Sequence, residues 1–400
     1  MTSARSAVPE HGAAWFGWVL CFVFALSPLL AWLSPLGFTP LAALGGLLAI
    51  AALRVPESDR PAALAILVLA SWALISTTWS PFTPTGFGNA TGLKLLTQGI
   101  VYWALFRSAA AASSRVLDIA LRVLAWGMAA FGLILLAEAL TGAAIYKVLR
   151  EAIGDPIRPD LAIRNVAQGG FVLAVLAPAA AVAGWRTGAG LWPALSVALG
   201  VAGASFGLDA DAPIIAMTAS LLVGWAVCRW PVLAPRAVAG LAVVLMLGAP
   251  WIVLAARQIG WFQRLEAVVP LSWQMRMGYW RHAADRILAD PMRGWGIDAS
   301  RTFGPEITLH PHNGALQVWL ELGLIGAVAA AVFWGVAIAR QSGSQASLGR
   351  AAAVATAVAY LTFAAVSFGV WQDWWLALGA VAATACLALQ RQGSDQPARS

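Results

Sequence analysis

Long apolar runs separated by polar connections dominate the pattern of this chain. A run of about 20 apolar residues is long enough for a helix to cross the hydrocarbon core of a bilayer. We therefore predict an all-α polytopic membrane protein with about twelve transmembrane helices and a large helical loop. The expected spans are 14–33, 36–53, 61–78, 93–110, 118–140, 167–185, 190–207, 213–229, 235–256, 314–339, 351–368 and 372–390. No repeat or linker interrupts them, so residues 1–400 are expected to form one membrane domain.

The basic residues indicate an orientation for these spans. With the N-terminus inside, every cytoplasmic segment carries at least one arginine, from Arg5 to Arg399. The short outside connections carry no arginine, and Lys94 is the only base near one. Cytoplasmic loops are enriched in Lys and Arg, so both termini are predicted to be cytoplasmic. Two long loops, 141–166 and 257–313, then lie outside, where the positive-inside rule does not restrict their charge.

Composition supports this class of protein. Of the 400 residues, 60% are hydrophobic and 11% are charged, against roughly 25% charged in an average soluble domain. The formal net charge of +7 would suggest a nucleic-acid partner for a soluble protein. Here we assign it to loops that set topology, and no nucleic acid is expected. The three cysteines are odd in number and lie in apolar spans, so no disulfide framework is implied.

The loop 257–313 concentrates the groups that can carry chemistry. It contains three of the four histidines and seven arginines: Arg257, Arg264, Arg276, Arg281, Arg286, Arg293 and Arg301. Histidine exchanges protons near neutral pH, and the arginine fork matches phosphate oxygens. Together at a membrane surface, they predict chemistry on an anionic, lipid-linked substrate. For any single arginine, the alternative is a solvated surface residue in an ion pair.

Within this loop, residues 272–290 are predicted to form an amphipathic helix. Ser272 is the expected N-cap, and Asp290-Pro291 ends the pattern. The helix is expected to lie on the membrane or to line the mouth of a cavity. Its apolar stripe consists of Trp273, Met277, Trp280, Ala284, Ile287 and Leu288.

The loop ends at His310-Pro311-His312-Asn313-Gly314, directly before an apolar span. Asn313 is predicted to cap that helix. The positive end of the helix disfavours a protonated imidazole and so keeps a histidine available as a base. Glu321 lies two turns into the span, where a carboxylate needs a partner. No cysteine, third histidine or acidic cluster completes a metal site, so none is expected.

Asp373 follows in the last outside turn, between tryptophans typical of a membrane interface. We interpret it as a partner that orients His312 or an arginine. The alternative is a carboxylate simply solvated at the surface.

The segment from His310 to Gly326 resembles the signature of the O-antigen ligase and polymerase superfamily. That signature is His-x-His-Asn, a Leu, then Glu-x-Gly and a second Gly. It is matched by His310 to Asn313, Leu316, Glu321-Leu-Gly323 and Gly326. Three further segments resemble the same family: Ser272-x-x-x-Arg276-x-x-x-Trp280, Pro291-x-x-Gly294-x-Gly296 and Arg164-Asn165.

One segment departs from the family pattern. Members often carry Ser-x-x-Arg where this chain has Ser205-Phe-Gly-Leu followed by Asp209 and Asp211. No arginine role can be carried over to that position.

The resemblance implies a GT-C-like glycosyltransferase of the bacterial inner membrane, active on its periplasmic face in lipopolysaccharide biosynthesis. The donor would be an O-antigen glycan on undecaprenyl diphosphate, and the acceptor a sugar hydroxyl of lipid A–core. Transfer would invert the anomeric carbon and need no metal or other cofactor. His312 would be the catalytic base. Arg158, Arg164 and Arg276 would bind the diphosphate. Supporting roles fall to Asn165, Trp280, His310, Asn313, Glu321 and Asp373.

Several alternatives stay open at this stage. An O-antigen polymerase uses the same kind of donor with a second lipid-linked glycan as acceptor, and protein O-oligosaccharyltransferases share the motif. A lipid or sugar transporter is a different class, but transporters commonly show repeats that this chain lacks. A non-catalytic membrane scaffold would not need the histidines and arginines. The oligomeric state is left open.

Overall fold

The computed structural model describes residues 10–395, so Arg5 and Arg399 of the orientation argument lie outside it. The described chain contains fifteen α-helices, a few short 3-10 turns and no strand. The helices are α1 Glu10–Leu33, α2 Phe38–Leu48, α3 Arg60–Ser76, α4 Thr91–Ala111, α5 Ser114–Thr141, α6 Ala144–Ala152, α7 Pro159–Arg186, α8 Trp192–Gly207, α9 Asp211–Arg229, α10 Leu233–Gln258, α11 Trp261–Glu266, α12 Leu271–Ala289, α13 Gly314–Ala339, α14 Leu348–Val366 and α15 Asp373–Asp395.

The prediction of an all-α polytopic membrane protein is confirmed. Within residues 10–395, nine helices are long and apolar enough to cross a membrane: α1, α3, α5, α7, α9, α10, α13, α14 and α15. The other three expected spans correspond to α2, α4 and α8. The apolar helices around α2 and α8 are shorter, and α4 is interrupted by polar side chains such as Lys94 and Gln98. The number twelve therefore stays a prediction.

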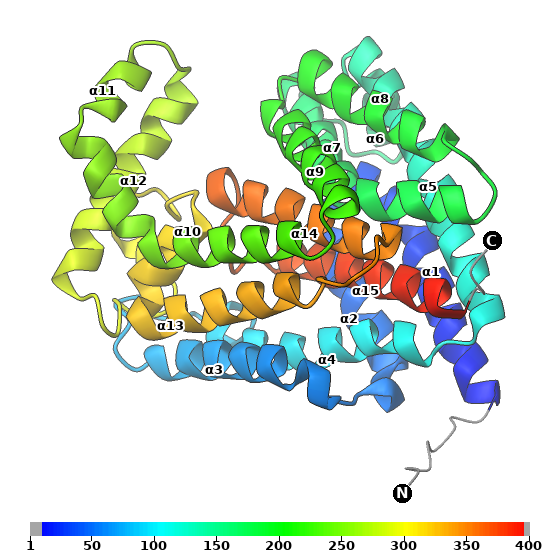
Figure 1. Ribbon diagram of the computed structural model, residues 1–400. Helices are drawn as coiled ribbons and strands as arrows, with labels where there is room; N and C mark the ends of the chain where they lie inside the picture. Colours follow the sequence, from blue (N-terminus) through cyan, green and yellow to red (C-terminus); the bar gives the residue numbers. More distant parts are fainter. Residues whose placement is uncertain (1–9, 396–400) are drawn as a thin grey trace, which may run out of the picture.

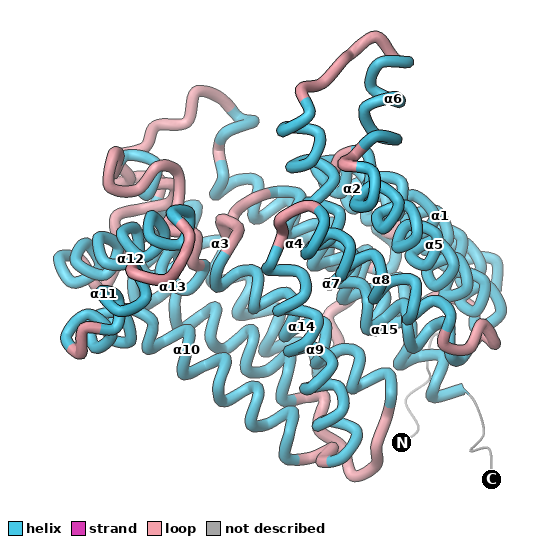
Figure 2. Tube along the Cα trace, turned by 90° about the horizontal axis from the view of Figure 1, so that it is seen from above, coloured by secondary structure: helices cyan, strands magenta, loops and turns pink. Residues whose placement is uncertain are grey.

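Two expected boundaries were wrong. The loop 141–166 contains the helix α6, and α7 begins at Pro159, eight residues before the expected span at 167. Proline at the first helical position and Asp160 in the first turn favour a helix start there. Arg164 and Asn165 therefore lie on a helix. Figure 2 shows α6 joined by loops to α5 and α7 and standing beside the start of α7.

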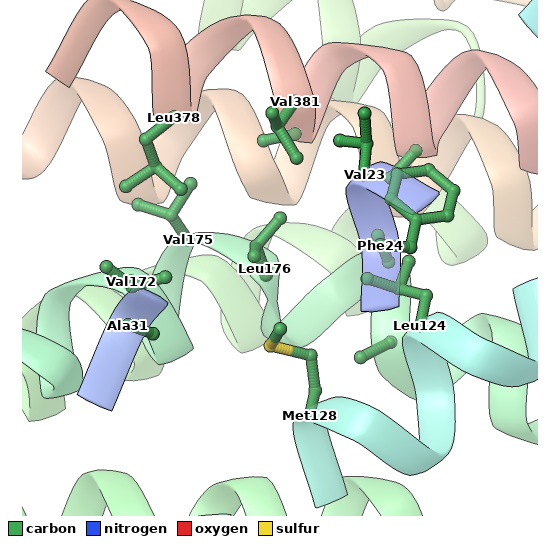
Figure 3. Close-up of a cluster of buried hydrophobic side chains, with 14 of the residues drawn as sticks. Val23, Phe24, Ala31, Leu124, Met128, Val172, Val175, Leu176, Leu378 and Val381 are labelled. Carbon is green, nitrogen blue, oxygen red and sulfur yellow. The ribbon is translucent and has the colours of Figure 1, made fainter. Parts of the chain in front are cut away.

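The helices are held together by close packing of small and aliphatic residues. Figure 3 shows Val23 and Phe24 of α1, Leu124 and Met128 of α5, and Leu378 of α15 in one buried cluster. In α5 and α8, Gly132 and Gly200 let the two backbones meet, since a Cβ on Gly132 would lie 2.3 Å from the Ser196 carbonyl oxygen. Van der Waals contact of this kind drives helix association in lipid.

One end of the bundle carries residues 310–313, and we call it the histidine end. Helices α11 and α12 lie at this end, while the start of α1 and the end of α15 lie at the opposite end (Figure 1). The connection after α3 is tied to the large loop here, because Trp79 Nε1 donates to the Gly294 carbonyl oxygen at 3.0 Å. Two of the connections that we expected outside the membrane, the one after α3 and the loop 257–313, thus meet at this end.

An ion-pair cluster connects helices at the opposite end of the bundle. Asp59, 1% exposed, accepts from Arg107 of α4 at 2.9 Å and pairs with Arg340, which follows α13, at 2.5 Å. A buried carboxylate needs such partners, because leaving it unpaired costs several kcal/mol, on the order of 3–5. The cluster joins α4 and the end of α13 to the start of α3.

Candidate active site

The first turn of α13 positions the two histidines. As predicted, Asn313 caps the helix, because its side-chain oxygen accepts from the Leu316 N–H at 3.0 Å. The preceding residue, His312, has a φ of +52°, a left-handed conformation that is uncommon for a residue with a side chain. Such strain clusters at functional sites, where the surrounding contacts maintain it.

A backbone carbonyl far along the chain orients the His312 ring. The Nδ1 atom of His312 lies 2.6 Å from the Ser367 carbonyl oxygen, in the connection between α14 and α15. A carbonyl only accepts, so Nδ1 carries the proton. In the neutral imidazole, Nε2 is then the unprotonated nitrogen. His312 is thereby held in the tautomer that can take a proton at Nε2.

His310 uses its Nδ1 as a hydrogen-bond acceptor, whereas His312 uses its Nδ1 as a donor. Its Nδ1 accepts the His312 backbone N–H at 3.2 Å, so the lone pair of that nitrogen is already used. Its ring packs on Gly369, where an added Cβ would lie 2.9 Å from Cδ2. Burial, with contributions from His312 and Arg301, lowers the pKa of His310 to about 3. His310 is therefore neutral near pH 7 and presents Nε2–H, a donor rather than a base.

Burial also lowers the pKa of His312, more than the Ser367 hydrogen bond raises it, and Arg276 lowers it further. The imidazole is half-buried and stacks on the Tyr279 ring, with centroids 6.1 Å apart and an angle of 19° between the ring planes. Tyr279 is fixed in turn by a 2.7 Å hydrogen bond between its hydroxyl and that of Thr308. A neutral, fixed imidazole beside an arginine is suited to general-base chemistry on an anionic substrate.

Helix α12 carries Arg276 and Tyr279, and its expected position in the loop is confirmed. Met277, Ala284 and Ile287 of the expected stripe are buried. Leu288 was expected inside but is 49% exposed. Ser272 is not the N-cap, because the helix begins one residue earlier and Pro270 occupies that position. Trp280 is partly buried against the hydrophobic cluster that contains Met277, Ala284 and Ile287. Its Nε1 has no hydrogen-bond partner among the described residues.

The seven arginines of the loop separate into three kinds. Four are in ion pairs with acidic side chains: Arg257, Arg281, Arg293 and Arg301. Arg286 lies over the rings of Trp295 and Phe303. The remaining two, Arg264 and Arg276, make no ion pair within the described chain.

Of these last two, Arg264 is exposed and Arg276 is half-buried. Burial lowers the pKa of Arg276, whose guanidinium lies over the Trp273 ring at 5.1 Å. An arginine stays protonated in proteins, so Arg276 is a partly desolvated cation ready for an anion.

The two other arginines expected to bind the diphosphate lie on the α6–α7 segment. Arg158 forms a bidentate ion pair with Asp160, with N–O distances of 2.8 and 3.2 Å. The Arg158 side chain is 72% exposed. Arg164 is exposed on the first turns of α7. Exposed pairs contribute little energy, so neither side chain is fixed in place for an anion. Of the three arginines, only Arg276 has a charge that lowers the pKa of His312.

The Glu321 side chain has the partners that we expected from the sequence. They are hydrogen-bond donors, and none of the donating groups is charged. The carboxylate is fully buried. Its oxygens accept from the side chains of Ser300 at 2.6 Å and Gln317 at 3.2 Å, the backbone N–H of Asp298 at 2.9 Å and the Trp371 indole at 2.6 Å. The carboxylate thus joins the large loop, α13 and the α14–α15 connection around the histidine turn.

Two glycines of the family-like segments allow the loop to lie against α13. A Cβ on Gly294 would lie 2.5 Å from the Gly323 backbone nitrogen, and one on Gly323 would lie 2.5 Å from the Met292 carbonyl oxygen. Both have positive φ, +71° and +61°. Only glycine combines this conformation with so close an approach. The two motifs therefore form one backbone contact.

Asp373 does not orient His312 or an arginine through any hydrogen bond in the described chain. Its two oxygens accept from Lys94 at 2.8 Å and Gln98 at 3.0 Å, both on α4. The surface alternative is also wrong, because the side chain is only 33% exposed and is ion-paired. Lys94 was the lone base near a short outside connection, and Asp373 is its counter-ion.

Sequence reasoning missed the α14–α15 connection. Ser367 orients His312, Gly369 supports His310, and the Val370 N–H donates to Gln317 Oε1 at 3.0 Å. Two of these contacts use backbone atoms, which no residue type reveals. The only sequence signal was Trp371, beside the singled-out Asp373.

Two further points concern residues considered earlier. Asp209 has a φ of +53° and Asp211 is the first residue of α9. Nothing in the structure explains why these acids replace the family arginine. Within residues 10–395, no group of three His, Cys, Asp or Glu side chains is placed to hold a metal ion.

The fold and the site define a polytopic membrane protein with a fixed, neutral histidine at one end of its bundle. A family model for O-antigen ligases matches residues 196–331, which include the whole of α12 and the histidine turn. This match covers 136 of the 400 residues, so the similarity to that family extends over this part of the chain.

Curated relatives are similar to this chain over a shorter stretch. A protein of Rickettsia felis named "Putative polysaccharide ligase" is 28% identical over 118 residues, which are 26% of this chain and 29% of that protein. A Rickettsia bellii protein of the same name is 30% identical over 119 residues, 26% of this chain and 28% of that protein. The match thus spans less than a third of each relative's length.

Proposed function

We propose that the protein is an O-antigen ligase. It transfers an O-antigen glycan from undecaprenyl diphosphate to a sugar hydroxyl of lipid A–core, at the periplasmic face of the inner membrane. The match to the O-antigen ligase family model and the similarity to polysaccharide ligases support a polysaccharide ligase in general. The observation that carries the mechanism is the 2.6 Å hydrogen bond from His312 Nδ1 to the Ser367 carbonyl oxygen, which leaves Nε2 as a base.

In the proposed reaction, His312 Nε2 takes the proton from the acceptor hydroxyl as its oxygen attacks the anomeric carbon of the donor. The bond from that carbon to the diphosphate oxygen breaks, and the diphosphate leaves on its lipid carrier. Attack from the face opposite the leaving group inverts the anomeric centre. The developing negative charge needs cationic stabilisation, and Arg276 is the half-buried cation next to His312.

The roles of the remaining site residues follow from their contacts. Asn313 sets the start of α13, and Glu321 holds the surrounding loops. His310 supports the turn through the His312 N–H. Arg158 and Arg164 are assigned to the approach of the diphosphate, since both lie outside the immediate surroundings of His312. Trp280 lies on α12, the helix that carries Arg276, and Asn165 lines the neighbouring cavity described below.

The decisive experiment compares glycans in cells with and without the protein. A ligase defect leaves polymerised repeats on undecaprenyl diphosphate and none on lipid A–core. A polymerase defect instead leaves single repeats on lipid A–core. Complementation with His312→Ala should reproduce the deletion, and complementation with the parent chain should reverse it. Unchanged surface glycans in the deletion strain would refute the proposal.

A further inference from the structure

A second polar region lies beside the histidine turn. A cavity of about 780 Å³ opens at the histidine end, within the range of roughly 300–1,000 Å³ usual for ligand sites. It lies between the α1–α2 connection, α6, the first turns of α7 and the α14–α15 connection. The side chains used below are Tyr146, Arg150, Asn165, Gln168, Phe368, Gln372, Asp373 and Trp374.

The charged groups of this cavity are already neutralised. Arg150 donates to the Asp155 carboxylate at 2.5 Å and to the Asp155 carbonyl oxygen at 2.9 Å. Asp373 is paired with Lys94 at 2.8 Å. Among the described residues that line the cavity, both charged side chains thus have counter-ions, whereas Arg276 makes no ion pair. The cavity is suited to an uncharged ligand.

Several hydrogen-bonding groups remain available. Within residues 10–395, the Gln168 side chain makes no hydrogen bond, so both halves of its amide can face a ligand. Asn165 uses only its Nδ2, which donates weakly to the Tyr146 hydroxyl at 3.5 Å. Asp373 uses two of its roughly four acceptor positions. These groups match the paired donors and acceptors of sugar hydroxyls.

Aromatic rings complete the lining. Phe368 and Trp374 pack edge to face at 4.9 Å on one side, and Tyr146 lies on another element. The negative face of an aromatic ring attracts the polarised C–H groups of a sugar. Aromatic faces together with amide and carboxylate groups fit a hydroxylated ring better than a lipid chain.

The α14–α15 connection contacts both His312 and the cavity. Ser367 accepts the His312 hydrogen bond, while the next residue, Phe368, lines the cavity. Gln372, further along this connection, lines it as well. A glycan whose reacting sugar is at His312 can therefore extend its neighbouring sugars into this space.

We propose that the cavity is a carbohydrate subsite for uncharged sugar residues next to the reacting one. The inference rests on the proposed glycosyl transfer and adds the place where the glycan is recognised. Both substrates carry such sugars, the lipid A–core acceptor and the O-antigen donor, so the experiment below distinguishes them.

Gln168→Ala removes a hydrogen-bonding group, and Gln168→Trp fills the cavity. Gln263→Ala is the matched control, because Gln263 is exposed on α11 and outside the cavity. KM and kcat are measured for each substrate with purified protein in nanodiscs, after thermal unfolding has shown that the variants are folded. Gln168→Ala should raise one KM about 2- to 10-fold with little change in kcat, the usual effect of one lost hydrogen bond. Gln168→Trp should raise the same KM further.

Binding is measured separately by saturation-transfer NMR with two soluble probes, lipid-free core oligosaccharide and lipid-free O-antigen repeat. Loss of core binding in Gln168→Trp assigns the cavity to the acceptor, and loss of repeat binding assigns it to the donor. If both probes bind Gln168→Trp as they bind the parent, and neither KM moves, the proposal is wrong. Binding does not require turnover, so it decides the matter even if no glycosyl transfer is found.

Discussion

His312 Nδ1 and the Ser367 carbonyl oxygen lie 2.6 Å apart, and they come from connections 55 residues apart in the chain. His310 Nδ1, by contrast, is occupied by the His312 backbone N–H. Within residues 10–395, only one of the two imidazoles, that of His312, therefore has a basic nitrogen that is not already engaged. The two histidines therefore differ in their hydrogen bonds, although their residue type and exposure are similar.

The first prediction concerns this pair. His312→Ala should lower transfer by about 100- to 10,000-fold, the usual contribution of a general base. His310→Ala should remain active but impaired, because it removes a support of the turn. A timed assay with purified donor and acceptor separates the two. His312→Ala should still bind the lipid-linked donor. A dead His310→Ala beside an active His312→Ala would reverse the assignment.

The second prediction concerns pH. His312 acts only when unprotonated, and an ordinary histidine is half protonated at about pH 6.5. Because its pKa is lowered, the base form persists as the pH falls below that value. A profile of kcat/KM from roughly pH 4.5 to 8 should therefore reach its half-maximal point below pH 6.5. A half-maximal point at or above 6.5 contradicts a desolvated base.

The third prediction concerns Arg276. Arg276→Gln should reduce transfer about 100-fold, comparable to losing one transition-state donor. Arg276→Lys keeps the charge but loses the fork, so it should also be defective. Only Arg276→Gln removes the positive charge that lowers the His312 pKa, so it should move the acid limb to higher pH.

The matched control for Arg276 is Arg264→Gln, since Arg264 is exposed and makes no ion pair within residues 10–395. It should transfer like the parent. Full activity in Arg276→Lys would move the diphosphate role to Arg158 or Arg164.

The fourth prediction concerns the two interlocked glycines. Gly323→Ala and Gly294→Ala each place a Cβ about 2.5 Å from backbone atoms in a left-handed conformation. Strain of this kind costs about 1–3 kcal/mol before the clash is added. Thermal unfolding in detergent should show a clear loss of stability. Gly278→Ala on α12 is the control, because nothing lies within 4 Å of its added Cβ, and it should be neutral or stabilising.

The fifth prediction concerns topology. Reporter fusions after Arg229 and after Gly294 should report opposite sides of the membrane, the first cytoplasmic and the second periplasmic. These positions follow α9 and α12, at opposite ends of the helix α10 that separates them. Signals from the same side would refute both the orientation and the placement of the site.

Local features of the site were predictable from the sequence. Apolar periodicity located α12, and residue type located the Asn313 cap, because both depend on neighbours within a few residues. Glu321 was expected to have a partner, but the sequence could not identify Trp371, which is 50 residues away. The Lys94–Asp373 pair spans 279 residues, so no local pattern joins its members.

The contacts of His312 with the α14–α15 connection also determine when the site can form. A chain synthesised from its N-terminus makes the histidine turn before Ser367, Val370 and Trp371 exist. The base is therefore oriented only after α14 has been made and the following connection has folded back onto α13. Until then, a nascent chain in the membrane has the histidine but no fixed tautomer, and the proposed glycan transfer must wait for the completion of the bundle.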